Sequence, residues 1–297
     1  QWQRFFVNLR PSLASYPILV EPHTSPRVSW GFGCEESCNQ TSFHVQVFND
    51  TDTINPLVDI TANVAQQYLA IDAGKLAPAT RYHWRVRVAA QTSTNATLTS
   101  GWSVRNTFFT GLATWHSAPI WSPPNATGQQ PRFALLRRQL TLPTTASPIT
   151  SALLFVTANP PMNIMGSASR MNPPKILAAY KLWVNNVLVG VGPGRAICGP
   201  VHLNDAGPCA QFPGSRPPQQ MYDGYDVTKT VTSGGFNGTG GIDVFVVGYG
   251  VNQTGRVPDA PEGSLGPKVQ AELHITHRDG ARTTLVTNAT WHGMSGD

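Results

Sequence analysis

Acidic side chains are the first residues of this chain to consider for chemistry, because two carboxyl groups that face each other across a substrate bond can act as acid and base. Asp259 and Glu262 are the pair that such a mechanism would favour, since both lie in one Pro/Gly-rich loop. Asp226 lies in a strand-like motif and Asp279 in a turn. Exposed loop acids are usually solvated charges, so we assign no catalytic residue and predict that these residues do not form an enzyme site.

The histidine and glycine motifs lack the arrangement of a metal or cofactor site. His274 and His277 are spaced like half a metal motif, but on a strand such a pair points to opposite faces. Gly190-Val-Gly192 and Gly192-Pro-Gly194 lack the strand–turn–helix context of a nucleotide loop, and the proline removes an amide donor. No Gly-x-Ser-x-Gly nucleophile motif precedes a helix. We therefore predict no metal and no cofactor.

The four cysteines form two local pairs, Cys34 with Cys38 and Cys198 with Cys209, each in a loop rich in Gly, Pro or Asn. In an oxidising compartment local disulfides are the simplest pairing, although four cysteines permit three connectivities. A four-cysteine zinc site is the alternative, but these spacings do not match a zinc ribbon or finger. The cysteines therefore favour disulfides.

Asn-x-Thr sequons indicate the compartment. Seven occur, none with proline in the middle. The predicted glycosylation sites are Asn39, Asn49, Asn95, Asn125, Asn237, Asn252 and Asn288. The first residue, Gln1, suggests that a targeting peptide has been removed, and no apolar run is long enough to span a membrane. These features predict a secreted, N-glycosylated protein, and a bacterial protein with unused sequons is the alternative.

Composition predicts short strands joined by many turns. The 297 residues allow two domains, and 25 prolines and 27 glycines with only 12% charged residues argue against a helical bundle or a disordered polyelectrolyte. The net charge of +5 comes from a scarcity of acids, while the arginines are scattered. Nucleic acid would need a clustered basic face, so we predict no nucleic-acid partner and keep acidic polysaccharide as an open alternative.

The segment Leu76–Val88 carries the clearest structural pattern. A turn on Pro78 and Thr80 leads into a strand in which Tyr82 and Trp84 share one face and alternate with polar residues. Such a pattern predicts an antiparallel sandwich strand, with Tyr82 forming a tyrosine corner and Trp30 as the buried tryptophan.

The chain divides into four predicted parts. An extended arm covers residues 1–20, a fibronectin type III-like domain 21–112, a linker 113–131 and a jelly-roll-like β-sandwich 132–297. In the last part, Met221–Val231 is expected to be a strand, and hairpins are expected to turn at Asn185-Asn186 and Arg278–Gly280. The predicted fold class is all-β, with two β-sandwich domains.

The ordered motifs resemble the N-terminal, non-catalytic region of α-L-rhamnosidases. The matching segments include Pro26–Trp30, Tyr82–Val88, Phe108–Leu112, Leu182–Asn186 and Tyr222–Thr228. The resemblance implies that glycosidase chemistry belongs to a following α/α barrel, which supplies the acid and base carboxylates. The residues up to Asp297 lie before any such domain.

Aromatic side chains give one binding hypothesis, because exposed rings on a jelly-roll module can stack on sugars. The candidates are Trp115, Trp121, Tyr180, Trp183, Tyr222, Tyr225 and Tyr249. Core packing is the alternative for each ring.

The N-terminal arm gives a second hypothesis. Its apolar residues need a covering surface and are Trp2, Phe5, Phe6, Val7 and Leu9. The resemblance implies a second sandwich that is one strand short at Asp297, and an open edge invites pairing. If the arm of one molecule fills the edge of the next, a head-to-tail filament forms. We therefore predict a non-catalytic structural protein that self-associates, with a carbohydrate-binding accessory region of an α-L-rhamnosidase-like enzyme as the alternative.

Overall fold

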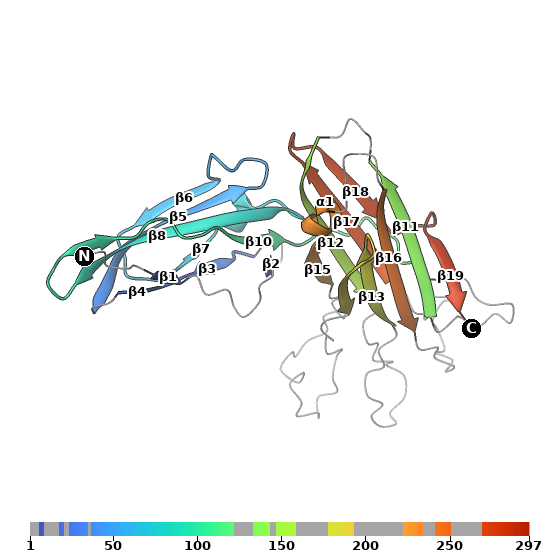
Figure 1. Cartoon of the computed structure of the whole chain (residues 1–297), viewed down its shortest axis with the longest axis horizontal. Helices are drawn as coiled ribbons and strands as arrows, with labels where there is room; N and C mark the ends of the chain where they lie inside the picture. Colours follow the sequence, from blue (N-terminus) through green and yellow to red (C-terminus); the bar gives the residue numbers. More distant parts are fainter. Residues whose placement is uncertain are drawn as a thin grey trace, which may run out of the picture. The chain divides into compact units, whose positions relative to one another are not determined.

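The computed structural model describes residues 6–8, 18–20, 24–34, 37–121, 133–142, 147–158, 178–192, 222–233, 241–250 and 269–296. It divides into two compact units, one of Gln1–Thr114 with Thr276–Ala281 and one of Trp115–Ile275 with Arg282–Asp297. Each unit is built almost entirely from strands (Figure 1). The predicted all-β class with two β-sandwiches is confirmed. The finer boundaries of arm and linker stay a prediction.

The described part of the first unit contains a six-stranded sheet and two small two-stranded sheets, β1-β4 and β3-β7. Its strands are β1 (Phe6–Asn8), β2 (Ile18–Val20), β3 (Arg27–Ser29), β4 (Gly31–Gly33), β5 (Cys38–Asn49), β6 (Val58–Ala62), β7 (Tyr68–Ala70), β8 (Arg81–Thr92), β9 (Thr97–Thr99) and β10 (Asn106–Thr110), with a 3-10 turn at Ala73–Lys75. The large sheet has the order β2-β10-β8-β5-β6, with β9 also on β8, while β3 pairs with β7. Inward side chains of β3, β5 and β8 form one apolar core.

Strand β8 alternates as its sequence predicts. Tyr82 is 1% exposed and Trp84 7% exposed, which confirms that both rings are buried. The backbone N–H of Ala77 donates to the Tyr82 hydroxyl at 2.7 Å, so the tyrosine corner is confirmed. Trp30 is buried too, and its indole N–H donates to Gln40 Oε1 at 3.1 Å. These contacts make β8 the central support of the first unit.

The last residues of the predicted arm form β2, an edge strand of this sheet. Strand β2 runs parallel to β10, with Ile18 opposite Phe108 and Val20 opposite Thr110. The Gly111 backbone N–H also donates to the Val20 carbonyl at 2.8 Å. Pairing with β2 satisfies backbone groups of β10 that would otherwise lack strand partners. The sequence pattern missed this strand because three residues are too few to show an alternation.

The second unit is a sandwich of a five-stranded and a four-stranded sheet. Its elements are β11 (Phe133–Thr141), β12 (Ile149–Ala158), β13 (Ala178–Val184), β14 (Val187–Gly192), β15 (Asp223–Asp226), α1 (Thr228–Ser233), β16 (Gly241–Gly250), β17 (Val269–His277), β18 (Arg282–Val286) and β19 (His292–Gly296). The sheet orders are β14-β13-β16-β11-β19 and β15-β12-β17-β18. Inward residues of both sheets form the second core.

Both predicted hairpin turns are confirmed, and one predicted strand is corrected. Asn185 and Asn186 adopt φ of 48° and 64°, and Gly280 adopts 84°, as the predicted hairpin turns require. The predicted strand 221–231 was wrong in its second half, where helix α1 begins. Asp226 Oδ1 accepts a hydrogen bond from the Thr228 backbone N–H at 3.0 Å, which caps the helix start.

Candidate functional site

Several residues proposed for chemistry lie outside the described residues. These are the acid pair and the second cysteine pair, Asp259, Glu262, Cys198 and Cys209. The predicted histidine pair is described: His274 Nε2 lies 2.9 Å from Glu272 Oε2, while His277 is buried. No group of three or more potential metal ligands occurs within the described ranges.

Two glycines of β14 are explained by tyrosine rings in the second unit. A Cβ on Gly192 would lie 2.4 Å from the Tyr180 ring and hydroxyl, and one on Gly190 would lie 2.4 Å from the Tyr225 ring. The Tyr180 hydroxyl donates to Asp223 Oδ2 at 2.6 Å and lies 3.1 Å from the Tyr225 hydroxyl. The Gly-x-Gly motif therefore leaves room for packed rings. Two glycines at alternate positions of one strand are the sequence signal for such a close approach.

The electrostatics of this cluster favour neutral tyrosines. Burial is the main cause that raises the pKa of Tyr180 far above its ordinary value, and Tyr225 and Asp223 add to it. Burial likewise raises the pKa of Tyr225. Both hydroxyls thus stay protonated at physiological pH and can donate hydrogen bonds. Asp223 accepts one of these bonds and Asp226 caps α1, so both acids of β15 have structural hydrogen bonds.

The predicted sugar-stacking aromatics differ in how far they are buried. Tyr180 is fully buried, whereas Trp115, Trp121 and Trp183 are half-buried. Trp115 packs edge-on against Tyr222 with centroids 5.6 Å apart, and Trp183 packs against Phe245 at 5.4 Å. Trp121 packs against the core, Tyr225 is half-buried, and the side chain of Tyr249 lies outside the described residues.

A buried carboxylate anchors the segment that follows the first unit. The Glu272 side chain is 0% exposed, and its Oε1 accepts hydrogen bonds from the backbone N–H groups of His116 and of Ser117, the latter at 2.7 Å. Burial alone would raise the pKa of Glu272. Hydrogen bonds from His274, Ser117 and His116 outweigh burial and lower this pKa to about 2. Backbone pairing holds the same segment, because the Ala118 N–H donates to the Thr287 carbonyl at 2.8 Å.

Three arginines and two aromatic rings form a column on the outer face of the large sheet in the first unit. In order, the column is Arg87, Trp102, Arg85, Phe48 and Arg105, and we call it the arginine column. Successive guanidinium carbons lie 4.8, 4.4, 5.2 and 4.7 Å from the ring centroids next to them. These contacts are within cation–π range.

Strand register and one crossing segment assemble the column. Arg85 lies opposite Gln46 and Arg87 opposite His44 in the β8–β5 pair, so these side chains share a face. The segment after β9 is held beside β8, because the Ser103 N–H donates to the Val86 carbonyl at 2.8 Å. This segment brings Trp102 and Arg105 to the column. The sequence interpretation of scattered arginines was therefore wrong for these three, whose proximity depends on non-local pairing.

The predicted modification sites are partly described. Asn39, Asn95 and Asn288 are exposed, and Asn49 is half-buried. Asn125, Asn237 and Asn252 lie outside the described residues. Asn288 Oδ1 accepts a hydrogen bond from the Thr290 N–H at 2.9 Å. The sequons therefore include accessible turn and strand positions, while their glycosylation stays a prediction.

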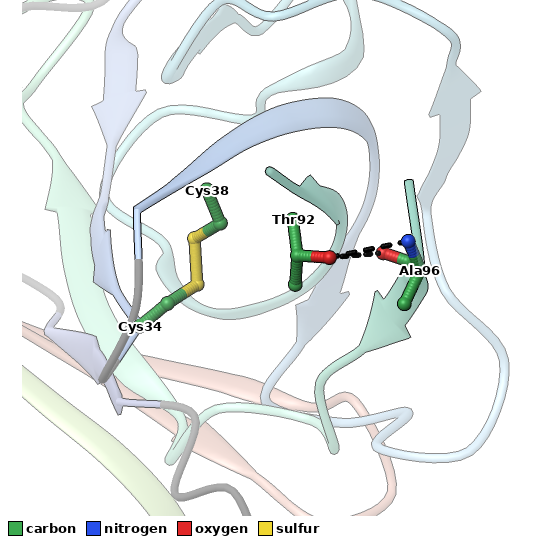
Figure 2. The surroundings of a disulfide bond; sticks show 4 residues. All are labelled: Cys34, Cys38, Thr92 and Ala96. Atoms are coloured by element: carbon green, nitrogen blue, oxygen red, sulfur yellow. Dashed lines mark hydrogen bonds between the residues drawn. A yellow bond between two sulfur atoms is a disulfide. The ribbon is translucent and has the colours of Figure 1, made fainter. Parts of the chain in front are cut away.

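Cys34 and Cys38 form a disulfide at the start of β5 (Figure 2). Cys38 pairs in register with Thr92, where β8 ends. Thr92 Oγ1 accepts a hydrogen bond from the Ala96 N–H at 3.1 Å, which stabilises the turn that carries Asn95 (Figure 2). The local pairing predicted for this cysteine pair is thus present.

The predicted assembly arm is described only in part. Phe6 and Val7 belong to β1, which pairs antiparallel with β4 of the same chain. Trp2, Phe5 and Leu9 lie outside the described residues. At the other end, β19 pairs with β11 and forms an edge of the five-stranded sheet.

The architecture is that of two β-sandwich domains in series, the first of immunoglobulin type. Residues 8–114 match the family model described as the Rha78A-like, N-terminal immunoglobulin domain. The chain thus resembles the N-terminal, non-catalytic region of α-L-rhamnosidases, as its motifs predicted.

Solved structures support the same fold over both units. The α-L-rhamnosidase from Aspergillus terreus is 18% identical with a TM-score of 0.62, covering 99% of this chain and 30% of that protein. The α-L-rhamnosidase from Dictyoglumus thermophilum is 20% identical with a TM-score of 0.58, covering 95% and 28%. The chain therefore spans less than a third of these proteins. No curated protein matches the sequence.

Nothing in the described part of the chain is a helix of the length and apolar character needed to cross a membrane.

Proposed function

We propose that this chain is the non-catalytic N-terminal region of a secreted, N-glycosylated α-L-rhamnosidase-like glycoside hydrolase. The observation that carries the proposal is the fold likeness to two α-L-rhamnosidases over 95% and 99% of the chain, joined to the family match of residues 8–114. In this role the two sandwiches form a folded accessory region, and the two hydrolytic carboxyl groups are supplied from elsewhere.

The surface chemistry supports the extracellular part of the proposal. Asn39, Asn95 and Asn288 are exposed, so oligosaccharide can reach these sequons without disturbing a core. The Cys34–Cys38 disulfide is of the kind that persists in oxidising compartments. Extracellular secretion is therefore the expected localisation.

Two measurements test the proposal. The 297-residue chain, produced alone, is expected to leave an aryl α-L-rhamnoside unhydrolysed. The natural protein, isolated with an antibody against this chain and freed of N-glycans, is expected to have a mass far above 32.1 kDa and to hydrolyse the same substrate. A natural mass equal to that of this chain would contradict the accessory role. Hydrolysis by the isolated chain would contradict the non-catalytic role.

Head-to-tail self-association is a second candidate, which the edge strand β14 favours. Val187, Leu188 and Val191 are 52%, 52% and 58% exposed, so this strand, an edge among the described strands, presents apolar side chains where another strand could pair. Removing residues 1–17 leaves β2 in place and tests the arm. Sedimentation should then show a loss of concentration-dependent assembly, and assembly of unchanged size would rule out the arm.

A further inference from the structure

The arginine column concentrates three positive charges, and the charge of Asp59 acts on two of them, Arg85 and Arg87. No ion pair joins Arg85, Arg87 or Arg105 to a carboxylate within the described ranges. Asp59, an acid on this face, contacts His44 and accepts a hydrogen bond from Gln46 Nε2 at 3.1 Å. The three guanidinium groups are thus held by the ring contacts and by hydrogen bonds to uncharged groups, including two from Arg85 to Gln46 Oε1 at 2.9 and 2.7 Å.

Like charges in such a column repel one another. The pKa of Arg85, the central arginine, is lowered from its ordinary value, first by burial and then by the charges of Arg105 and Arg87, which outweigh the opposing charge of Asp59. A bound anion would offset this repulsion, because each guanidinium would then have a counter-charge. The column is therefore better satisfied with an anionic ligand than without one.

The two end arginines retain unused donors that point to the class of anion. Among their hydrogen bonds, Arg87 donates from Nε to His44 Nδ1 at 3.2 Å, and Arg105 donates from Nη2 to the Thr53 carbonyl at 3.0 Å. Both residues are exposed, so a ligand can approach their side chains. A guanidinium edge with two free N–H groups binds a carboxylate in bidentate fashion.

We propose that the arginine column is a binding site for the carboxylate groups of an acidic polysaccharide. Arg87 and Arg105 bind carboxylates, and Arg85 holds the two rings that position them. Alternate members of the column carry charge, so the site suits a chain with acid groups at repeated intervals. This inference stands on the first unit alone and does not depend on the proposed enzyme context.

The contacts that the two rings of the column already make favour an acidic ligand over other classes. Trp102 is contacted by Arg85, Arg87 and, edge-on, by His44 at 4.8 Å. Phe48 is buried and contacted by Arg85 and Arg105. Neutral sugars and single-stranded nucleic acids bind largely by stacking on free ring faces. The column instead offers guanidinium edges, which favour acid groups over a base or a neutral sugar.

Affinity electrophoresis of the whole chain tests the proposal. Polygalacturonate in the gel is the probe, neutral dextran is the control polymer, and a single-stranded oligonucleotide is the competing polyanion. We expect retardation by polygalacturonate, weakened by added salt because the contacts are exposed charges. The double variant R87Q/R105Q should bind about tenfold more weakly, since each exposed charge contact contributes about 0.7 kcal/mol.

A matched control separates the site from net charge. Arg278 is an exposed arginine in a hairpin turn that makes none of the ring contacts of the column, and R278Q removes one positive charge. Its affinity should stay within about twofold of the wild type. If R87Q/R105Q proves unfolded by circular dichroism, the single variants R87Q and R105Q replace it, each with an expected loss of about threefold. Equal loss in R278Q, unchanged affinity in the column variants, or tighter binding of dextran or the oligonucleotide would overturn the proposal.

Discussion

Replacing Glu272 by glutamine should destabilise the second unit in a pH-dependent way. The Glu272 carboxylate is 0% exposed and accepts hydrogen bonds from His274 Nε2 at 2.9 Å and from the Ser117 N–H at 2.7 Å. Glutamine keeps the side-chain size but removes the charge. It also places an amide donor where one oxygen accepted a bond, which leaves buried donors poorly satisfied.

The magnitude follows from the pKa of this carboxyl. Lowering the pKa from 4.5 to about 2 on folding corresponds to about 3 kcal/mol of stability at neutral pH. Because the folded pKa is depressed, this stability is present above pH 4.5 and is lost as the pH falls toward about 2. At about pH 3 roughly half of it should be gone. The glutamine variant lacks this contribution at every pH.

Urea denaturation at pH 7 and pH 3 provides the assay, with tryptophan fluorescence as the probe. We expect E272Q to be less stable than the wild type by about 3 kcal/mol at pH 7, and the deficit to shrink to roughly half at pH 3. Asp279, an exposed acid in a hairpin turn, supplies the control, and D279N should change stability by less than about 0.5 kcal/mol. A deficit of equal size at both pH values, or none at pH 7, would refute the reasoning about Glu272.

Two further substitutions test the packing of each unit. Tyr82→Phe removes the acceptor of the Ala77 N–H and should lower the free energy of unfolding of the first unit by about 1 to 3 kcal/mol, measured by urea denaturation; no change would show that the corner is dispensable. Gly192→Ala should cost about 1 to 3 kcal/mol, because its Cβ would lie 2.4 Å from Tyr180, whereas Gly33→Ala meets no atom within 4 Å and should be tolerated. Equal melting temperatures for the two glycine variants would contradict the close approach.

The elements that the sequence could predict are those whose signal is local. In Leu76–Val88, burial alternates with every residue of the strand, so a period of two identifies both the strand and its inner face. The Asn185-Asn186 turn is local as well, because asparagine tolerates the positive φ that a two-residue hairpin needs. Neither inference required knowledge of a distant partner.

Features that depend on distant pairing could not be predicted in the same way. Strand β2 is recognisable only through its parallel pairing with β10, about ninety residues further along the chain. The switch from β15 to α1 depends on a side-chain cap at Asp226, which the apolar pattern does not record. Gly190 and Gly192 resemble a weak nucleotide motif in the sequence, and only the close approach of Tyr225 and Tyr180 explains them. In each case the deciding contact joins segments far apart in sequence or lies outside the hydrophobic pattern.

Strand β8 connects the scaffold to the proposed binding surface. Its inner face buries Tyr82 and Trp84 in the core, while Arg85 and Arg87 on its outer face belong to the arginine column. Because the same backbone carries both faces, packing of the inner rings fixes where the outer guanidiniums lie. Sites supported by a packed strand hold their geometry better than sites on loops. The conservative change Tyr82→Phe should therefore weaken stability while leaving the column in place, so a variant that stays folded should still bind polygalacturonate.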